Sequence, residues 1–270
     1  MTLPSNISYQ TDLIFHRYEG EVEAFSDYWV IRTPSNPTFW FGNFILFRRA
    51  PAGDQVCDQW LQVHHQHFAD TLNHRVFGWD ESSEGEITPF LKSGFKTSHG
   101  IALALKQPPE RPRLNPSLEI RPIVSAADWE LVAQQQIRSD RKDFQYPEDG
   151  GAFRRQKLAN YQAMSADQRG NWWGAFEGDT LVGNMGLFFD AQNRVGRFQN
   201  VGTHPAYRRQ RVCTTLLDHI VRDAFNRVGA EQLVICTGME DHNPAIPTYR
   251  NFGFADAGSS YAVMRAPGRP

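Results

Sequence analysis

The clearest pattern along the chain is an apolar segment, residues 195–203, that leads through a basic loop into a segment with helical spacing. Apolar side chains recur there at every fourth position, at Val212, Leu216, Ile220, Ala224 and Val228. This spacing predicts an amphipathic helix, and Gly229 directly after it predicts the C-terminal stop. The pattern therefore predicts a strand, a basic loop and a buried helix in succession.

The start of this helix has the properties of an anion site. The first N–H groups of any helix lack partners inside it, and the helix dipole places partial positive charge there. Three cations, Arg208, Arg209 and Arg211, lie directly before the helix. Because unpaired N–H groups and cations meet at this point, the loop and helix predict a binding site for phosphate.

The same periodicities predict a mixed α/β order around this helix. The strands predicted after residue 117 are residues 118–122, 172–176, 181–189, 195–203, 232–237 and 261–264. Two helices, the first over residues 126–136, precede the three central strands, and a polar region occupies residues 138–170. A last helix contains Tyr249.

An earlier copy of this order is predicted in the N-terminal part of the chain. Its elements are strands 28–32 and 39–47, helix 54–68, strand 74–77, a short helix that ends at residues 89–95, and strand 98–105. Both parts end in a helix, a Gly-Phe pair and a strand, which indicates two similar units in tandem. Asp54 is expected to cap its helix and to repel a phosphate, so we expect a degenerate first unit.

A boundary between the two units is predicted where four prolines interrupt the polar residues 106–117. Proline cannot continue a helix or a central strand, and this composition suits a semi-rigid linker. We therefore predict a first domain over residues 1–108, a linker over residues 109–117 and a second domain over residues 118–270.

The strand, loop and helix resemble the phosphate-binding motif of the GCN5-related N-acetyltransferase (GNAT) family, which reads V-x-P-x-Y-R-x-x-G-x-G/A. The residues that agree with it are Thr203, His204, Pro205, Tyr207 and Arg208. The two glycine positions of the family fall on Arg211 and Cys213. Since glycine lets a backbone approach its ligand, Arg211 either adds a phosphate contact or lies across the site and blocks it.

A second motif strengthens the resemblance. GNAT proteins carry N-x-x-A-x-x-x-Y-x-x-x-G-F after the next strand, and here Tyr249 has the expected distance to Gly253 and Phe254. Asn243 lies one residue closer to Tyr249 than in the family pattern. The resemblance covers most of residues 118–265 and implies an α/β protein with a mixed sheet and the GNAT fold in two tandem units.

The resemblance implies acetyl-CoA as co-substrate, with the main chain of Val201, Gly202 and Thr203 paired with its pantetheine arm. The other implied cofactor-binding residues are Arg208, Arg209, Gln210, Arg211, Val212, Cys213, Thr214, Asn243 and Tyr249. Tyr249 would also donate a hydrogen bond or a proton to the departing sulfur. The implied reaction is direct attack by a primary amine of a small molecule, amino acid or peptide, without a cysteine nucleophile.

The general base is left open by the sequence. Many GNAT relatives place a glutamate on the strand before the loop, but residues 196–200 contain no carboxylate. The candidates are Glu240, Asp241, His204, or a water held by Gln199 or Asn200, and Glu240 is the one we place beside Tyr249 as catalytic. For the acceptor side the candidates are Asp140, Asp143 and Tyr146, and we expect the first unit to shape or cover the acceptor pocket.

Composition argues against several other classes of protein. The 28 basic and 30 acidic residues give a formal net charge of −2, which is no electrostatic footprint for nucleic acid. An apolar leader and an apolar run long enough to span a bilayer are both lacking in the sequence. Three scattered cysteines suggest neither disulfides nor zinc, so we expect a cytoplasmic protein without a membrane partner. No feature predicts its oligomeric state.

A histidine cluster is the one candidate for a metal site. His64, His65 and His67 lie on one predicted helix, but no carboxylate or cysteine recurs at ligand spacing. The pattern therefore favours a solvated polar face, and we predict no metal.

Two functions remain open at this stage. The first is the acetyl-CoA-dependent N-acetyltransferase just described. The second is a non-catalytic GNAT-like sensor or interaction module that binds CoA, favoured by the residues at the two glycine positions and by the missing carboxylate on the strand.

Overall fold

The computed structural model describes residues 3–69, 71–143, 151–190 and 194–266. The chain forms two compact units. Unit 1 consists of Met1–Leu103, Cys236–Ala245 and Asp256–Pro270, and unit 2 consists of Ala104–Ile235 and Ile246–Ala255. The predicted division into residues 1–108, a linker and residues 118–270 concerns family domains and stays a prediction.

Unit 2 is a mixed sheet with helices on both faces. The elements along this part of the chain are β6 (Glu119–Pro122), α4 (Ala126–Asp143), α5 (Ala152–Ala166), β7 (Gly170–Glu177), β8 (Thr180–Asp190), β9 (Val195–Thr203), α6 (Val212–Asp223), the π-helical turn η3 (Ala224–Val228), β10 (Gln232–Gly238) and α7 (Ala245–Phe252). The strands follow one another in the order β10-β9-β8-β7-β6. β9 and β10 are parallel, and the other neighbours are antiparallel.

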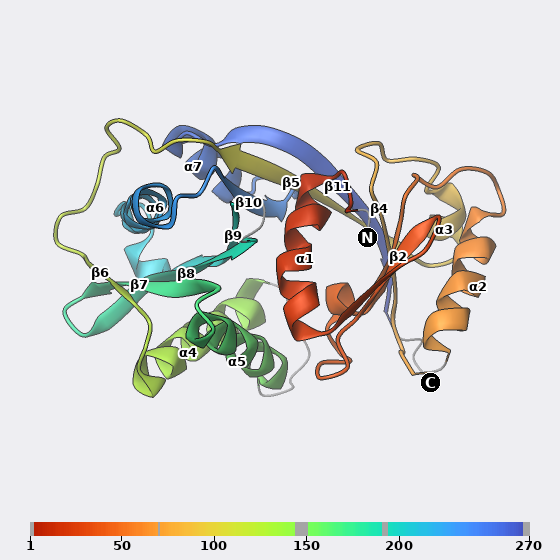
Figure 1. Ribbon diagram of the computed structural model, residues 1–270, viewed down its shortest axis with the longest axis horizontal. Coiled ribbons are helices and arrows are strands. Elements are labelled where there is room, and N and C mark those ends of the chain that lie inside the picture. Colours follow the sequence, from red (N-terminus) through yellow and green to blue (C-terminus); the bar gives the residue numbers. More distant parts are fainter. Residues whose placement is uncertain (1–2, 70, 144–150, 191–193, 267–270) are drawn as a thin grey trace. The chain divides into compact units, whose positions relative to one another are not determined.

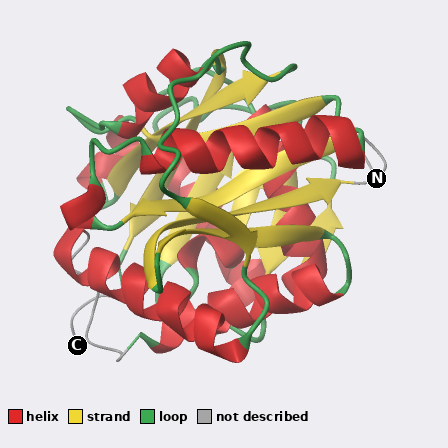
Figure 2. Ribbon diagram, turned by 90° about the vertical axis from the view of Figure 1, so that its left-hand side faces the viewer, coloured by secondary structure: helices red, strands yellow, loops and turns green. Residues whose placement is uncertain are grey.

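Helix α6 is held closely against this sheet. It packs on β7, β8 and β9, whereas α4 and α5 lie on the opposite face (Figure 1). Figure 2 shows the strands between helices from a second direction. A Cβ atom at Gly183 would lie 2.6 Å from Cγ1 of Val212, so glycine at that position permits the contact. The start of α6 is therefore fixed relative to the strands.

The predicted helix and its stop are confirmed. The apolar face of α6 is buried, at Val212, Leu216, Leu217, Ile220 and Val221, and each such side chain contributes roughly 2 kcal/mol of transfer free energy. Gly229 ends the helical segment in a left-handed conformation with a φ of 77°, which a residue with a Cβ adopts reluctantly.

Unit 1 also contains a run of paired strands of mixed orientation. Its elements are α1 (Ile7–Glu19), β1 (Glu21–Ala24), β2 (Tyr28–Arg32), the 3-10 turn η1 (Trp40–Gly42), β3 (Phe44–Phe47), α2 (Val56–Phe68), β4 (Arg75–Trp79), α3 (Thr88–Lys92), β5 (Lys96–Leu105) and β11 (Ala255–Arg265). The strand order is β1-β2-β3-β4-β11-β5. β3 and β4 are parallel, and β11 pairs antiparallel with β4. The C-terminal strand thus completes the unit that the N-terminal part of the chain begins.

The strand predicted over residues 39–47 is only partly correct. Residues 40–42 form η1, and the strand begins at Phe44. The side chain of Asn43 explains the break, because its Oδ1 accepts from the N–H of Thr33 at 2.9 Å while its Nδ2 donates to the carbonyl of Phe39 at 2.9 Å. These bonds turn the chain before the strand starts.

The capping role predicted for Asp54 is wrong. The N-cap of α2 is Gln55, whose side chain makes no capping hydrogen bond, and Asp54 is exposed.

Two carboxylates from elsewhere in unit 1 accept hydrogen bonds from the main chain of the loop before α2. Glu81 accepts from the N–H of Ala50 at 3.0 Å, and Glu86 accepts from the N–H of Gly53 at 2.7 Å. Arg49 pairs with Glu81 at 2.7 Å. Negative charge of the protein itself therefore already lies against this loop.

The histidine cluster is also different from its prediction. His65 is exposed, but His64 is fully buried, at 4.8 Å from the ring of Phe68. Neither ring nitrogen of His64 has a hydrogen-bond partner in the described structure. Burial, together with the nearby Arg75, lowers the pKa of His64 from 6.5 to about 3. His64 is therefore a neutral core residue and not part of a solvated face.

We predict that His64 makes the fold acid-sensitive. Below pH 6.5 the unfolded chain takes up a proton that native His64 does not, so stability falls as the pH falls from about 6.5 towards 3. The His64→Leu variant should escape a loss of about 2 kcal/mol between pH 7 and pH 5. Urea unfolding at both pH values measures the difference. The exposed His65→Leu variant serves as the control, and an unchanged pH dependence in His64→Leu would contradict the assignment.

Candidate active site

The site begins at a bulge in strand β9. Gly186 pairs with Gln199 and Asn184 pairs with Gly202, so two residues of β9 stand opposite one residue of β8. Asn200 within this bulge has a φ of 46°. A bulge bends its strand and redirects the backbone that follows, here Val201, Gly202 and Thr203.

The loop after β9, residues 204–211, is called the arginine loop below. It opens with the 3-10 turn η2 (Pro205–Tyr207), where Nδ1 of His204 accepts from the N–H of Ala206 at 3.4 Å. His204, a candidate base in the sequence, thus acts as a local cap. Arg209 and Arg211 then have φ values of 64° and 63°. The glycine position of the motif that Arg211 occupies is therefore left-handed, as a glycine would allow.

The backbone from this loop into α6 presents a series of unpaired donors. Within the described part of the chain, the N–H groups of residues 209–214 have no acceptor, and the first N–H of α6 that is bonded belongs to Thr215. An unpaired buried N–H is costly; residues 209–211 are exposed, whereas Val212 is buried and Cys213 and Thr214 are half-buried. The N–H groups form a concentrated donor site for an anion.

Positive charge surrounds these donors. Arg208, Arg209 and Arg211 are all exposed. A cavity of about 290 Å³ lies beside the loop and is lined by Leu114, Asn115, Pro116, Arg209, Gln210 and Arg211. Geometry and charge here both suit a phosphate group.

Tyr249 lies on α7 in the same unit. Its side chain is buried with 5% of its surface exposed, and its ring centroid is 6.2 Å from that of Phe254. The hydroxyl makes no hydrogen bond with any residue that the structure describes. Buried tyrosine hydroxyls normally have a partner, so this one is available to a ligand. Burial, with a smaller effect of Cys213, raises the pKa of Tyr249 and keeps its proton on.

Cys213 is the second residue of α6. Desolvation raises the pKa of its thiol to about 12, so the thiol stays protonated near neutral pH. A thiolate is the nucleophilic form of cysteine, and this environment therefore disfavours nucleophilic chemistry at Cys213. Residues 201–214 and Tyr249 all belong to unit 2.

Asn243 and Glu240 belong to unit 1, in the segment between β10 and α7. Nδ2 of Asn243 donates to the carbonyl of Gly238 at 2.7 Å and to Oγ1 of Thr237 at 2.9 Å. Its Oδ1 accepts from the N–H of Ala245, the first residue of α7, at 3.0 Å. Asn243 thus holds its own loop and caps the helix that carries Tyr249. Glu240 is exposed.

A network of buried amide side chains was not predicted from the sequence. Oδ1 of Asn184 accepts from Nε2 of Gln136 and Nε1 of Trp172, each at 3.1 Å, and its Nδ2 donates to Oε1 of Gln135. Gln136 in turn accepts from Nδ2 of Asn200 at 3.5 Å. The network therefore ties α4 to the bulge in β9. Buried glutamine and asparagine at positions 48 residues apart leave no local signal in a sequence.

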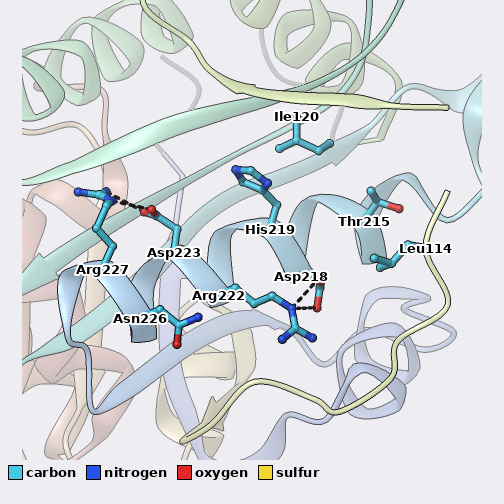
Figure 3. Close-up of a pocket in the computed structure, with 9 residues that line it drawn as sticks. All are labelled: Leu114, Ile120, Thr215, Asp218, His219, Arg222, Asp223, Asn226 and Arg227. Carbon is cyan, nitrogen blue, oxygen red and sulfur yellow. Dashed lines mark hydrogen bonds and ion pairs between the residues drawn. The ribbon is translucent and has the colours of Figure 1, made fainter. Parts of the chain in front are cut away.

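Another cavity of unit 2, of about 450 Å³, lies along α6 (Figure 3). Two ion pairs line it, Asp218 with Arg222 at 3.0 Å and Asp223 with Arg227 at 2.6 Å. Both pairs connect successive turns of the helix and stabilise it modestly. The charges of these four side chains are therefore paired within the protein.

The structure does not describe the side chains of the three residues predicted for the acceptor side. Tyr146 is not among the described residues, and nothing is said of the side chains of Asp140 and Asp143. Among residues 3–69, 71–143, 151–190 and 194–266, no three His, Cys, Asp or Glu side chains are grouped to hold a metal. Within the same ranges, none of the helices combines the length and the apolar composition that a bilayer crossing requires.

Comparisons with known proteins identify a related family and related folds. The Acetyltransferase (GNAT) family matches residues 134–254, which include the arginine loop and Tyr249. A stretch of 84 residues is 36% identical to the uncharacterised N-acetyltransferase YsnE of Bacillus subtilis (strain 168), covering 31% of this chain and 54% of that protein. The match thus spans about half of the length of this relative.

Solved structures show the same fold. A functionally unknown conserved protein from Staphylococcus epidermidis has a TM-score of 0.73 at 12% identity, covering 93% of this chain and 95% of that one. A GCN5-related N-acetyltransferase from Kribbella flavida has a TM-score of 0.60 at 14% identity over 98% and 97% of the two chains. A tandem GNAT protein from the clavulanic acid biosynthesis pathway has a TM-score of 0.55 at 12% identity over 90% and 83%.

Fold and family match together place the structure in the GNAT fold class. Residues 134–254 match the Acetyltransferase (GNAT) family. The predicted α/β GNAT fold is confirmed, and the likeness to a tandem GNAT protein extends over most of the chain.

We predict that Asn243→Ala destabilises the protein, because it removes a helix cap and three further side-chain hydrogen bonds, to Thr237, Gly238 and Glu240. The free energy of unfolding should fall by about 1–2 kcal/mol, measured by urea unfolding. Asn251→Ala, an exposed position on the same helix, is the matched control and should be neutral. Equal stability of the two variants would show that Asn243 does not hold the loop.

Proposed function

We propose that the protein is an N-acetyltransferase that moves an acetyl group from acetyl-CoA to a primary amine of a small molecule, amino acid or peptide by direct attack. The match to the GNAT family and the likeness to an N-acetyltransferase support acetyl transfer in general. The observation that carries the finer proposal is the pairing of two features in unit 2, the unpaired N–H groups of residues 209–214 and the unpartnered hydroxyl of Tyr249.

The arginine loop is proposed to bind the diphosphate of acetyl-CoA. Main-chain N–H groups of residues 209–214 would donate to the phosphate oxygens, and Arg208, Arg209 and Arg211 would add charge. The backbone of Val201, Gly202 and Thr203 would bind the pantetheine arm, since the bulge at Asn200 redirects this stretch. Asn243 is proposed to contribute indirectly, through the loop and helix that it holds.

The proposed chemistry needs one proton donor and one proton acceptor. The amine nitrogen attacks the thioester carbonyl, a C–N bond forms, and the C–S bond breaks. The departing thiolate of CoA takes a proton from the hydroxyl of Tyr249, while a base removes a proton from the acetylated nitrogen. Because burial raises the pKa of Tyr249, its hydroxyl stays protonated near neutral pH and can donate to the departing sulfur.

Glu240 is proposed as the base. It is exposed in the segment after β10, and the described side chains of β9 include no carboxylate to take this role. His204 is a weaker candidate because Nδ1 of its ring already accepts from Ala206.

We predict that Tyr249→Phe lowers kcat about 100-fold, as expected for loss of a general acid, and leaves the Kd for acetyl-CoA within about twofold. Thiol release from acetyl-CoA in the presence of an amine panel measures turnover, and calorimetric titration measures binding. Tyr28→Phe in unit 1 is the control. Unchanged turnover in Tyr249→Phe would remove Tyr249 from the mechanism.

Glu240→Gln tests the base separately. If the carboxylate accepts the amine proton, kcat/KM should fall by about 100-fold. An unaltered rate would assign the proton to solvent or to the intrinsic basicity of the acceptor.

A non-catalytic CoA-binding module is the second candidate, favoured by Arg211 and Cys213 at the glycine positions of the motif. Such a protein would gain thermal stability when CoA is added, because a ligand of the native state stabilises it, yet release no thiol with any amine. Thiol release above the background rate decides against it.

A further inference from the structure

The linker, residues 109–117, is attached along helix α6 at two places. At one end, Arg222 donates to the carbonyl of Pro109 at 3.0 Å. At the other end, the N–H of Asn115 donates to Oγ1 of Thr215 at 2.8 Å. The linker is therefore part of unit 2 and lies directly beside the arginine loop.

Asn115 also bonds to the arginine loop itself. Its Nδ2 donates to the carbonyl of Gln210 at 3.0 Å, and its Oδ1 accepts from both the N–H and the hydroxyl of Ser117, at 3.1 and 2.7 Å. The bonds to Ser117 fix the orientation of the amide, so that its donor group faces the loop.

A second connection runs through Thr215. The hydroxyl that accepts from Asn115 donates to the carbonyl of Arg211 at 2.8 Å, and the N–H of Thr215 donates to the same carbonyl at 2.9 Å. The carbonyls of Gln210 and Arg211 are thus both tied to the side of the linker and α6. With these acceptors occupied, the N–H groups of residues 209–214 remain available.

The loop needs such a restraint because of its residues. Arg209 and Arg211 both have positive φ, at 64° and 63°, a conformation that glycine adopts freely and other residues resist. Strained backbone of this kind persists only where the surrounding structure fixes it.

We propose that Asn115 is a positioning residue that holds the arginine loop in the left-handed conformation that binds the ligand. Its hydrogen bond keeps Arg211 in a conformation that the glycine of the motif would adopt freely. The proposal rests on the proposed function, namely that the loop binds CoA. The free-energy cost of the positive φ at Arg211 then arises during folding and not during CoA binding, which is the energetic benefit of preorganisation.

The test compares Arg211→Gly with Arg211→Ala, each in the natural background and combined with Asn115→Ala. Both variants lose the same charge and differ only in how well they tolerate positive φ. With Asn115 present, Arg211→Gly should have the higher Tm but a Kd for CoA within about twofold of Arg211→Ala. Without Asn115, Arg211→Gly should bind CoA about fivefold or more tightly than Arg211→Ala. Calorimetric titration and thermal unfolding supply both readouts.

The single variant Asn115→Ala should weaken CoA binding about tenfold. Arg222→Ala cuts the other attachment of the linker, so it controls for general loss of stability and should leave the Kd for CoA unchanged. The positioning role alone would be overturned if the natural protein and Asn115→Ala bound CoA with equal affinity. It would also be overturned if Arg211→Gly and Arg211→Ala bound CoA equally well in the Asn115→Ala background. Failure of the natural protein to bind CoA would instead overturn the proposed function on which it rests.

Discussion

The candidate site depends on one physical constraint, the unsatisfied hydrogen-bonding capacity at the start of helix α6. Packing of Val212 against Gly183 fixes where this helix begins, and the ties of Thr215 and Asn115 occupy the neighbouring carbonyls. What remains is a row of main-chain donors with three exposed arginines around it. A rigid row of donors needs little reorganisation when an anion arrives, and this makes it an effective binding site.

A strand-loop-helix arrangement occurs in both units, but different charged groups lie beside its loop in each. In unit 1 the loop before α2 is occupied by the carboxylates of Glu81 and Glu86, and the backbone bonds of Ala50 help to hold the pKa of Glu81 below its usual range. In unit 2 no described carboxylate takes that place, and arginines surround the loop. Internal carboxylates make the first loop a structural element, whereas the second keeps its donors for a ligand.

Local patterns in the sequence predicted much of the fold and part of the site. Helix α6 and its stop at Gly229 follow from apolar spacing and a glycine, and Tyr249 follows from a motif. Contacts between distant residues were not predictable: Glu86 on the loop at Gly53, Asn184 with Gln136, and the pairing of β11 with β4. His64 was misjudged because a buried, unpartnered imidazole looks polar in a sequence.

The most direct measurement is the backbone amide NMR spectrum of isotope-labelled protein during titration with CoA. If main-chain donors bind the diphosphate, the N–H resonances of residues 209–214 should move more than those elsewhere in unit 2 and saturate with the calorimetric Kd. The loop before α2 in unit 1 should remain unchanged. Saturable CoA binding that leaves the resonances of residues 209–214 in place would contradict the account.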